Sequence, residues 1–334
     1  MNMGSRGEDM SIERRLVFSR RLVGIVDIFF RLITRTGLLI RMPEHAQAYR
    51  IGGADLYPMT TRYSYDEIGE IEVPYIPGSS LKGRMRALLE QATGQKLYTT
   101  DSRIWQYVRS ISVMSIEELI NDVRNRNVIS ELFGWAAVNY KQLQEELDKA
   151  KKSGGYKYNE NILEEIFSNY LAPTRLIFSD LFPSKDYVEK IKATSISDFL
   201  EKKPENRIDR ITSAADPREV VRVKPGVEFE GRVSMLLYNI DNDSGVLRRY
   251  LETLVLGFKL IEKTYLGGSG SRGYGKVSFQ SFKIASYRIT DSGDSVYKLE
   301  KLDEKIYSNT DDLEEKIEEL VKDLSKIFES AKKS

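Results

Sequence analysis

Strand patterns and helix patterns alternate along this chain in an order that restricts the folds it can adopt. Residues Arg21–Arg41 are rich in Val, Ile and Phe with polar interruptions, which favours a long strand. Residues Glu228–Asn239 alternate apolar with polar side chains, as a half-buried strand does. The predicted core strands are Arg21–Arg41, Arg175–Phe178, Glu228–Asn239 and Lys276–Ile284, with a further short strand at Glu70–Ile76. One predicted core helix begins near Leu81, and the other spans Val246–Tyr265.

The resulting order is strand, loop, helix, strand, strand, helix, strand. This is the split βαβ, or ferredoxin-like, arrangement of an α+β fold. Its helices pack on one face of the sheet and leave the other face free to carry a ligand, as in RNA-recognition modules. We therefore predict an N-terminal extension over residues 1–20 and a core domain over residues 21–285.

Polar helical patterns interrupt this core and follow it. The patterns Ile116–Trp135, Tyr140–Lys152 and Asn161–Tyr170 make the middle of the chain longer than a compact domain needs. We predict one insertion at about 95–172 and a second, charged and partly helical insertion at 184–205. The tail, residues 286–334, is predicted as a helical extension with an amphipathic helix over Leu313–Phe328.

Composition excludes several classes of site. The chain has no cysteine, which excludes disulfides, thiolate metal sites and a cysteine nucleophile. His45 is the single histidine, so we expect neither a histidine-based triad nor a zinc site. No apolar run approaches the roughly 18 residues of a membrane helix, and Met1–Arg15 lacks an apolar signal core, so we expect a cytoplasmic protein without a membrane partner. The net charge is +1, so any nucleic-acid binding depends on where the basic groups gather.

The first stretch with chemical content is Tyr75–Arg86, which reads YIPGSSLKGRMR. The Pro-Gly pair favours a tight turn, and either Ser79 or Ser80 would cap the following helix. The amides at a helix start favour an anion. Three cations follow within two turns: Lys82, Arg84 and Arg86. Phosphate binding is one interpretation, and an ordinary capped helix with a solvated basic face is the other.

The second stretch is Tyr265–Lys276, which reads YLGGSGSRGYGK. Its five glycines would let the backbone approach a ligand closely. The spacing imitates a dinucleotide fingerprint and nearly imitates a P-loop, but genuine versions follow a strand and open a helix, whereas here a helix precedes and a strand follows. We favour a loop laid along a nucleic-acid backbone, with Arg272 and Lys276 nearby, over a mere flexible hairpin.

The third stretch, Asn206–Val223, is basic and β-rich, with a turn expected near Asp216-Pro217. A protruding hairpin that lays cations and apolar wedges on RNA would fit this pattern. A solvated edge hairpin would fit it as well.

Together the three stretches resemble the RAMP superfamily, and within it the Csm3-like members of the Cas7 type found in type III CRISPR complexes. The residues that carry the resemblance are Arg50–Gly53, Ile76–Arg86, Leu132–Gly134, Arg175–Asp180, Asn206–Thr212, Asp216–Arg218 and Leu266–Phe279. They follow the family's order and span most of the chain. The resemblance implies an RRM-like palm, a protruding thumb hairpin and a filament of repeated subunits along one guide RNA, the crRNA.

The resemblance also implies roles for individual residues. Guide phosphates would be contacted by Ser79, Ser80, Lys82, Arg84 and Arg86. The same groove would be lined by Gly268, Gly270, Arg272 and Gly273, with Lys276 nearby. The thumb, with Arg207, Arg210 and Arg218, would wedge into the guide–target duplex. The implied partners are the crRNA, the target RNA, neighbouring Cas7-like subunits, Cas10, and Cas5-like and small subunits.

One departure from the family concerns cleavage. Active members cut target RNA with an aspartate in the loop after the Gly-Gly pair, a position that falls near Thr60 or Thr61 here. A hydroxyl cannot replace a carboxylate that positions Mg²⁺, while Asp55 lies too close to the glycines and Asp66 falls later. We therefore expect an RNA-binding subunit without cleavage. The alternatives are a Mg²⁺-dependent target endoribonuclease that uses Asp55 or Asp66, and a Cas6-like guide-processing enzyme, which the single histidine disfavours.

Overall fold

A central antiparallel sheet organises the chain. The computed structural model describes residues 19–43, 56–99, 101–135, 140–152, 159, 161–292 and 296–332. The sheet contains, in spatial order, β10 (Tyr297–Asn309), β9 (Val277–Asp291), β1 (Leu22–Thr34), β8 (Glu228–Tyr238) and β4 (Leu176–Phe178), and β5 (Phe182–Pro183) also pairs with β8. The long first strand is thus shorter than predicted, because the chain bends at Arg35 and Thr36 before Leu38 bridges to Val223.

Helices pack against this sheet through a single apolar core. They are α2 (Gly78–Ala92), α8 (Ser244–Lys263), α9 (Thr310–Glu315), α10 (Ile317–Ser325) and the short turn η4 (Lys326–Lys332). Helix α8 contacts both α2 and α10. In chain order, β1, α2, β4, β8, α8 and β9 follow the predicted succession of strands and helices, and the predicted α+β class is confirmed.

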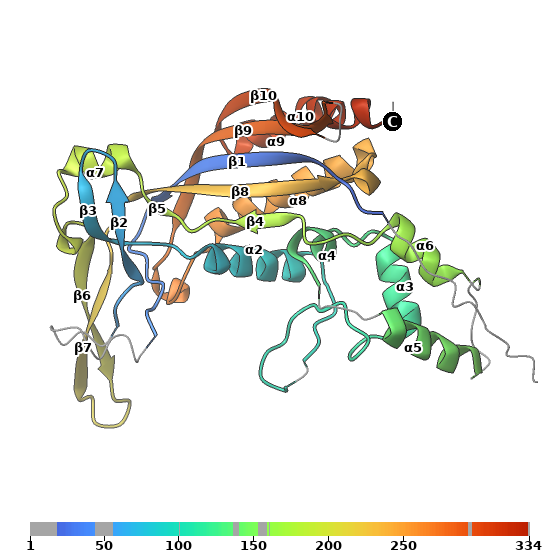
Figure 1. Ribbon diagram of the computed structural model, residues 1–334. Coiled ribbons are helices and arrows are strands. Elements are labelled where there is room, and N and C mark those ends of the chain that lie inside the picture. The colour runs from blue at the N-terminus through green and yellow to red at the C-terminus, as the bar shows by residue number, and fades with distance from the viewer. Residues whose placement is uncertain are drawn as a thin grey trace, which may run out of the picture.

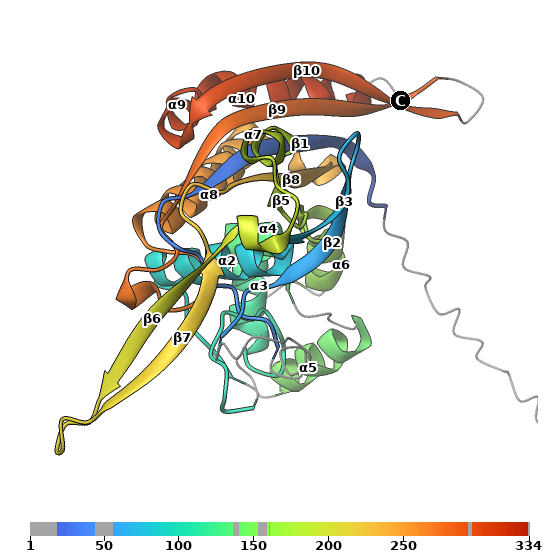
Figure 2. The same ribbon diagram turned by 90° about the vertical axis from the view of Figure 1, so that its left-hand side faces the viewer.

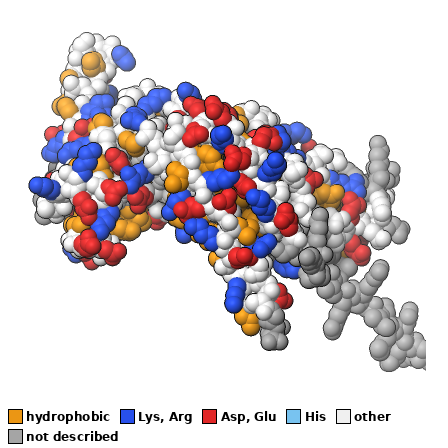
Figure 3. All heavy atoms as spheres, turned by 90° about the horizontal axis from the view of Figure 1, so that it is seen from above, with side chains coloured by type: hydrophobic (Ala, Val, Ile, Leu, Met, Phe, Trp, Pro, Cys, Tyr) orange, Lys and Arg blue, Asp and Glu red, His pale blue; other side chains and the backbone are white. Residues whose placement is uncertain are grey.

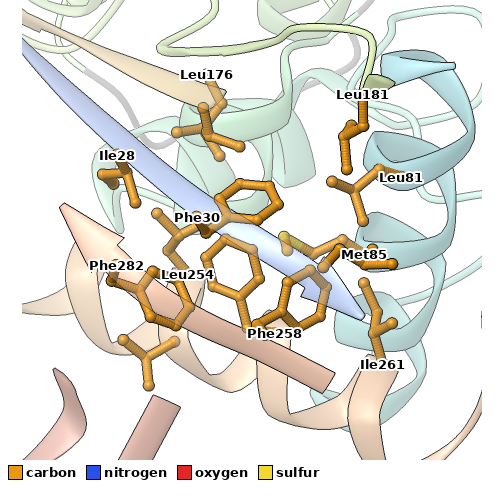
Figure 4. Packing of buried hydrophobic residues seen from close by; sticks show 14 of the residues in the cluster. Ile28, Phe30, Leu81, Met85, Leu176, Leu181, Leu254, Phe258, Ile261 and Phe282 are labelled. Atoms are coloured by element: carbon orange, nitrogen blue, oxygen red, sulfur yellow. The ribbon is translucent and has the colours of Figure 1, made fainter. Parts of the chain in front are cut away.

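The alternation of side chains along β1 explains why one face of the sheet is buried. Ile28 and Phe30 point into the helix layer, whereas Phe29 and Arg31 lie on the opposite, partly exposed face. Figure 4 shows Phe30 between residues of α2, α8 and β9. The Phe30 ring centroid lies 5.3 Å from that of Phe258, in the edge-to-face geometry that aromatic pairs prefer. Gly231 faces Phe30 across the β1–β8 ladder, where a Cβ would lie 2.6 Å from the ring.

Two hairpins extend from the body. The first joins β2 (Thr60–Tyr65) to β3 (Gly69–Pro74). After α7 (Lys185–Ile191) and the turn η1 (Ile196–Asp198), the second joins β6 (Leu200–Ile208) to β7 (Ala215–Val223), and Figures 1 and 2 show it projecting well clear of the other elements. We call this second hairpin the thumb hairpin, as predicted. Its turn lies at residues 209–214, so the prediction of a turn at Asp216-Pro217 was wrong: these residues pair with Asn206 and Arg207 inside the ladder.

Residues 95–172, here called the helical segment, form a second small core. The segment contains α3 (Ile116–Arg124), α4 (Val128–Phe133), α5 (Tyr140–Lys152) and α6 (Ile162–Asn169), close to the predicted helical ranges. Apolar residues of α3, α5 and α6 pack on one another rather than on the sheet. Ser115 and Glu118 form a capping box that fixes the start of α3.

A buried network of charges joins the helical segment to the sheet. Arg175, just before β4, donates to both carboxylate oxygens of Asp241, at 3.1 and 2.8 Å. Asp241 lies in η2 (Asn239–Asp241) after β8 and is fully buried. Arg126, between α3 and α4, donates to Asp241 at 2.7 Å and to Glu131 at 3.0 Å, and Tyr250 of α8 donates to Glu131 at 2.8 Å. These buried charges therefore hold four elements together: the start of β4, η2, the start of α4 and α8.

The tail differs from the prediction in two respects. Residues 297–309 form β10 rather than helix, and they pair along nearly their whole length with β9, with a bulge between Lys301 and Asp303. The predicted tail helix Leu313–Phe328 is interrupted at Lys316, which separates α9 from α10. Its predicted apolar stripe is buried as expected: Leu313, Ile317, Leu320, Leu324 and Ile327.

Charge is evenly mixed on the surface that carries β10. Figure 3 shows Lys and Arg interspersed with Asp and Glu over this face, in line with a net charge of +1. Among the described residues, no helix is long and apolar enough to cross a bilayer. Any attraction for nucleic acid must therefore come from local groups of cations.

The buried network predicts a large stability cost for Asp241→Asn. Burial tends to raise the pKa of Asp241, but the guanidinium groups of Arg175 and Arg126 and a backbone N–H outweigh it, so the pKa lies below its ordinary value. Removing this charge leaves buried Arg175 with only the more distant Glu131 carboxylate, at 3.9 Å, which should lower the free energy of unfolding by roughly 3–5 kcal/mol in urea titrations at neutral pH. The control is Asp243→Asn, which removes a nearby charge but preserves the N-cap of α8.

The same pKa shift gives the expected pH dependence. Because the folded pKa is lowered, the contribution of Asp241 is fully present above its unfolded pKa of about 3.9 and is lost as the pH falls through the folded value. Wild-type stability should thus fall on acidification more steeply than that of Asp241→Asn. The same pH dependence of the free energy of unfolding in the wild type and in Asp241→Asn would contradict a structural role for this pair. So would an Asp241→Asn variant as stable as the Asp243→Asn control.

Candidate nucleic-acid interface

The structure brings α2, the glycine-rich loop (residues 264–276) and the base of the thumb hairpin together. Figures 1 and 2 both place the short turn η3 (Gly270–Arg272) beside the start of α2. Arg84 of α2 donates to the Tyr265 carbonyl at 3.0 Å, and its guanidinium lies 4.0 Å from the centroid of the Tyr265 ring. The first two predicted stretches therefore form one continuous surface.

The start of α2 is capped differently from the prediction. The N-cap residue is Pro77, and neither Ser79 nor Ser80 caps the helix with its side chain, so the predicted serine cap was wrong. Instead the Gly78 N–H donates to Oδ1 of Asp180, at 2.7 Å. A carboxylate thus already occupies the positive end of the helix dipole. Any phosphate bound here depends on side chains further along α2.

The exposed face of α2 consists of small residues flanked by polar and basic ones. Gly83 is exposed, and a Cβ added there would meet nothing within 4 Å. Ser79, Lys82 and Arg86 lie along one flank at helical spacing. Burial, followed by the nearby Arg86 charge, lowers the pKa of Lys82, and no acidic partner for Lys82 is found in the described parts of the chain. An anion on this flank would relieve that repulsion.

Two of the predicted phosphate ligands also have structural roles. Arg84 is engaged with Tyr265 and Thr264, as described above. Arg86 donates to Glu90 at 2.7 Å and to the Tyr107 carbonyl at 2.7 Å, which fastens the helical segment to α2. Loss of Arg86 would therefore disturb packing as well as charge.

The positions of the loop that carry glycine do so for different physical reasons. A Cβ at Gly270 would overlap the ring of Tyr265. Gly273 has a φ of 84°, a value that residues with a Cβ rarely adopt. At Gly268, by contrast, a Cβ would make only ordinary contact with the Leu39 carbonyl. Gly268 is thus the position in this loop where the approach of a ligand, rather than the fold, best accounts for the missing side chain. Arg272 is exposed and donates to Ser269.

Tyr274 connects the loop to the thumb hairpin. The ring is buried, its hydroxyl donates to Glu205 at 2.6 Å, and Arg218 donates to the same carboxylate at 2.7 Å. Burial and then the hydrogen bond to Glu205 raise the pKa of Tyr274 to about 12. Lys203 and Arg222 lie 4.4 and 4.5 Å from the ring centroid. The direction in which the thumb hairpin projects is therefore coupled to the position of the glycine-rich loop.

The tip of the thumb hairpin is basic and apolar. Ile211 is 94% exposed and Ile208 is 55% exposed. Arg207 pairs with Asp216 at 2.8 Å, whereas Arg210 is exposed. Arg207 and Arg210 lie beside and within the turn at the end of the projecting hairpin, whereas Arg218 pairs with Glu205 further along the ladder toward its base. Lys276 donates to the Lys263 carbonyl at the end of α8 and is otherwise exposed.

The candidate catalytic residues fall in two places. Asp55 lies outside the described residues, as do His45 and Arg50–Gly53. Asp66 is exposed and lines a cavity of about 440 Å³ together with Asp180, Glu230, Lys185 and Arg232. Thr60 donates to Glu72 at 2.9 Å, at the start of β2. Where the structure describes the chain, no group of three His, Asp or Glu side chains is placed to hold a metal ion.

Several residues that shape this surface were not singled out from the sequence. Asp180 caps α2 from another part of the chain, and Tyr265, Tyr274 and Glu205 link its three pieces. The only sequence signal was the position of both tyrosines in the glycine-rich stretch, with Tyr265 before its first glycine and Tyr274 between its last two. Their roles depend on contacts between distant segments, which a local pattern does not reveal.

Comparisons with known proteins agree with the resemblance. The family model described as the RAMP superfamily matches residues 68–278. A protein named "CRISPR system Cms endoribonuclease Csm3" from Methanothermobacter thermautotrophicus is 33% identical over 260 residues, which cover 76% of this chain and 82% of that protein. The protein of the same name from Streptococcus thermophilus is 32% identical over 239 residues, covering 71% of this chain and 83% of that one.

A solved structure supports the fold. The crystal structure of Methanopyrus kandleri Csm3 is similar with a TM-score of 0.50 at 18% sequence identity, covering 91% of this chain and 99% of the other. The family model and the relatives together establish the family. The chain belongs to the RAMP superfamily, as a Csm3-like member.

Proposed function

We propose that this chain is an RNA-binding backbone subunit of a type III CRISPR interference complex, in antiviral defence. One observation carries the proposal beyond the family relationship: Arg84 and Tyr274 join α2, the glycine-rich loop and the thumb hairpin into one surface with partly or fully exposed cations. The guide RNA would lie along this surface. Its phosphates would be held by the residues that the sequence predicted.

The binding would be largely independent of base sequence. Lys82 and Arg272 can reach phosphates, and phosphate contacts fix position without reading bases. The small residue Gly83 would let the RNA backbone lie close to α2 between the flanking cations. Because the whole chain carries a net charge of +1, affinity must come from these few local contacts, and each should contribute about 0.7 to the slope of log affinity against log salt.

The apolar tip of the thumb hairpin fits the same proposal. An isoleucine that is 94% exposed gains nothing in the isolated chain, but it could separate stacked bases of a guide–target duplex. Neighbouring Cas7-like subunits, Cas10, and Cas5-like and small subunits are the proposed protein partners, and the proposed location is the cytoplasm.

A second candidate function is cleavage of target RNA. It is favoured by the printed name of the relatives, which calls them endoribonucleases, and by the position of Asp66 in a cavity that Asp180 and Glu230 also line. The described residues do not form a metal site, so we assign no metal-dependent step to them. Neither the family match nor the names of the relatives favour the Cas6-like alternative.

The first prediction concerns salt dependence. Lys82→Ala and Arg272→Ala should each weaken binding of single-stranded RNA and lower the slope of log affinity against log salt by about 0.7, the share of one phosphate contact. The measurement is fluorescence anisotropy of labelled RNA across a salt series. The matched control is Lys298→Ala on β10, an exposed lysine away from this surface. Unchanged slopes in both variants would mean that the RNA does not lie on this surface.

The second prediction separates stability from binding at one position. Gly83→Ala should raise the free energy of unfolding by about 0.5–1 kcal/mol, because alanine favours a helix interior and the added methyl group meets no neighbour. The same change should weaken RNA binding, because the methyl group stands where the backbone would approach. Ala87→Gly, one turn later, should lower the free energy of unfolding and leave RNA binding unchanged. An RNA affinity equal to wild type in Gly83→Ala would place the RNA elsewhere.

The third prediction addresses cleavage. In a complex assembled with one variant at a time, Asp55→Ala and Asp66→Ala should leave assembly and the pattern of target-RNA cuts unchanged, because we assign this subunit no cleavage of its own. The readout is the ladder of RNA products with Mg²⁺ present. Disappearance of a cut with either variant, in an intact complex, would establish the endoribonuclease instead.

A further inference from the structure

A cavity of about 280 Å³ lies where α2 meets the helical segment. Its lining includes Arg86, Gln106, Phe133, Gly134, Trp135 and Thr174. None of these residues except Arg86 has a part in the surface described above. The Leu-Phe-Gly sequence at residues 132–134, which the resemblance included, ends at this cavity.

The walls combine flat apolar groups with a few polar ones. Phe133 and Trp135 present aromatic rings, and the Arg109 guanidinium lies 5.1 Å from the centroid of the Trp135 ring. Arg109 is buried and paired with Asp122, so it restricts the orientation of the indole. Gln106 and Thr174 add an amide and a hydroxyl that have no side-chain hydrogen bond among the described residues. Aromatic walls with a few donors and acceptors are what enclose a single nucleobase in other proteins.

Gly134 keeps this space open. Its φ is 90°, and a Cβ there would overlap Oγ1 of Thr174. The cavity is slightly smaller than the roughly 300–1,000 Å³ of typical ligand pockets, which limits its occupant to a small planar group.

The surroundings specify the class of ligand. Arg86 belongs to the same flank of α2 as Lys82, so a polynucleotide whose phosphates follow this flank arrives at the cavity. Trp105, which precedes the lining residue Gln106 in the chain, is 63% exposed, and Ile104 is 64% exposed. Exposed tryptophans offer a stacking surface to bases of any sequence. Figures 1 and 2 show the chain that follows α2 extending on the same side of the body as the thumb hairpin.

We infer that this cavity receives one unstacked nucleobase of the bound RNA, held against Trp135 and hydrogen-bonded by Gln106 and Thr174. The inference rests on the proposed function, because the RNA must first lie along α2. It adds a base-contacting site to a surface that otherwise touches the phosphate backbone. Arg86 would bridge the two, since it lines the cavity and stands beside Lys82.

The chain carries its own reporter for this site. Its two tryptophans are Trp105, which precedes the lining residue Gln106 in the chain, and Trp135, which lies in the wall. In full-length Trp105→Phe, all tryptophan emission comes from Trp135. Titration with end-labelled oligouridylate and oligoadenylate gives RNA binding from label anisotropy and occupancy of the cavity from quenching of Trp135. The same oligonucleotides with abasic sites keep the phosphates but lack the bases.

The expected result is saturable quenching by the intact RNA, with the midpoint seen by anisotropy, and little quenching by the abasic RNA. Gln106→Ala and Thr174→Val should weaken binding of intact RNA about two- to ten-fold, the share of one hydrogen bond, and leave abasic RNA unaffected. RNA binding without quenching, or equal quenching by abasic RNA, would overturn the base site and leave the proposed function standing. Absence of RNA binding by anisotropy would overturn both.

Discussion

The bidentate pair of Arg175 and Asp241 is the interaction on which the arrangement of this molecule depends most. It lies where β4, the end of β8, α8 and the helical segment meet, and both partners are almost completely removed from water. A buried pair of this kind adds little net stability over well-packed apolar residues, but it penalises every arrangement that separates its members. Its contribution is therefore to specificity. Arg175 also donates to the Glu131 carbonyl of α4, and α4 ends at Phe133 in the wall of the cavity that Arg86 lines, so the pair helps to position that wall.

A similar logic governs the surface that we propose binds RNA. Of the predicted basic residues, Arg84, Arg86 and Arg218 are committed to contacts within the chain, whereas Lys82, Arg210 and Arg272 keep most of their capacity for a ligand. The committed arginines orient the elements, and the others remain available for phosphates. Guanidinium groups suit the first task because a planar fork can satisfy several acceptors at once. A count of cations in the sequence does not distinguish the two groups.

Much of the sheet and its helices could be predicted from sequence, because their patterns are local. Glu228–Tyr238 alternates cleanly, and α8 has a continuous apolar stripe. The strand β10 was missed because it is an edge strand with charged residues on both faces, and its bulge near Lys301 shifts the alternation halfway along. The cap of α2 was assigned to a serine because the true cap, Asp180, lies 102 residues away in the chain. For the candidate site, sequence identified the three stretches, while the tyrosines that join them became evident only from tertiary contacts.

The character of β10 has a consequence for how copies of this chain can associate. Its free edge carries lysines and glutamates and is distorted by the bulge, and Lys305 is already engaged with Glu319 of the tail. Another strand could add to this edge only by stripping water from those charges. The sheet therefore terminates within each molecule. An array of such molecules would therefore be held together by a shared nucleic acid and not by a sheet that continues from one subunit to the next. The length of that nucleic acid would then determine the number of subunits in the array.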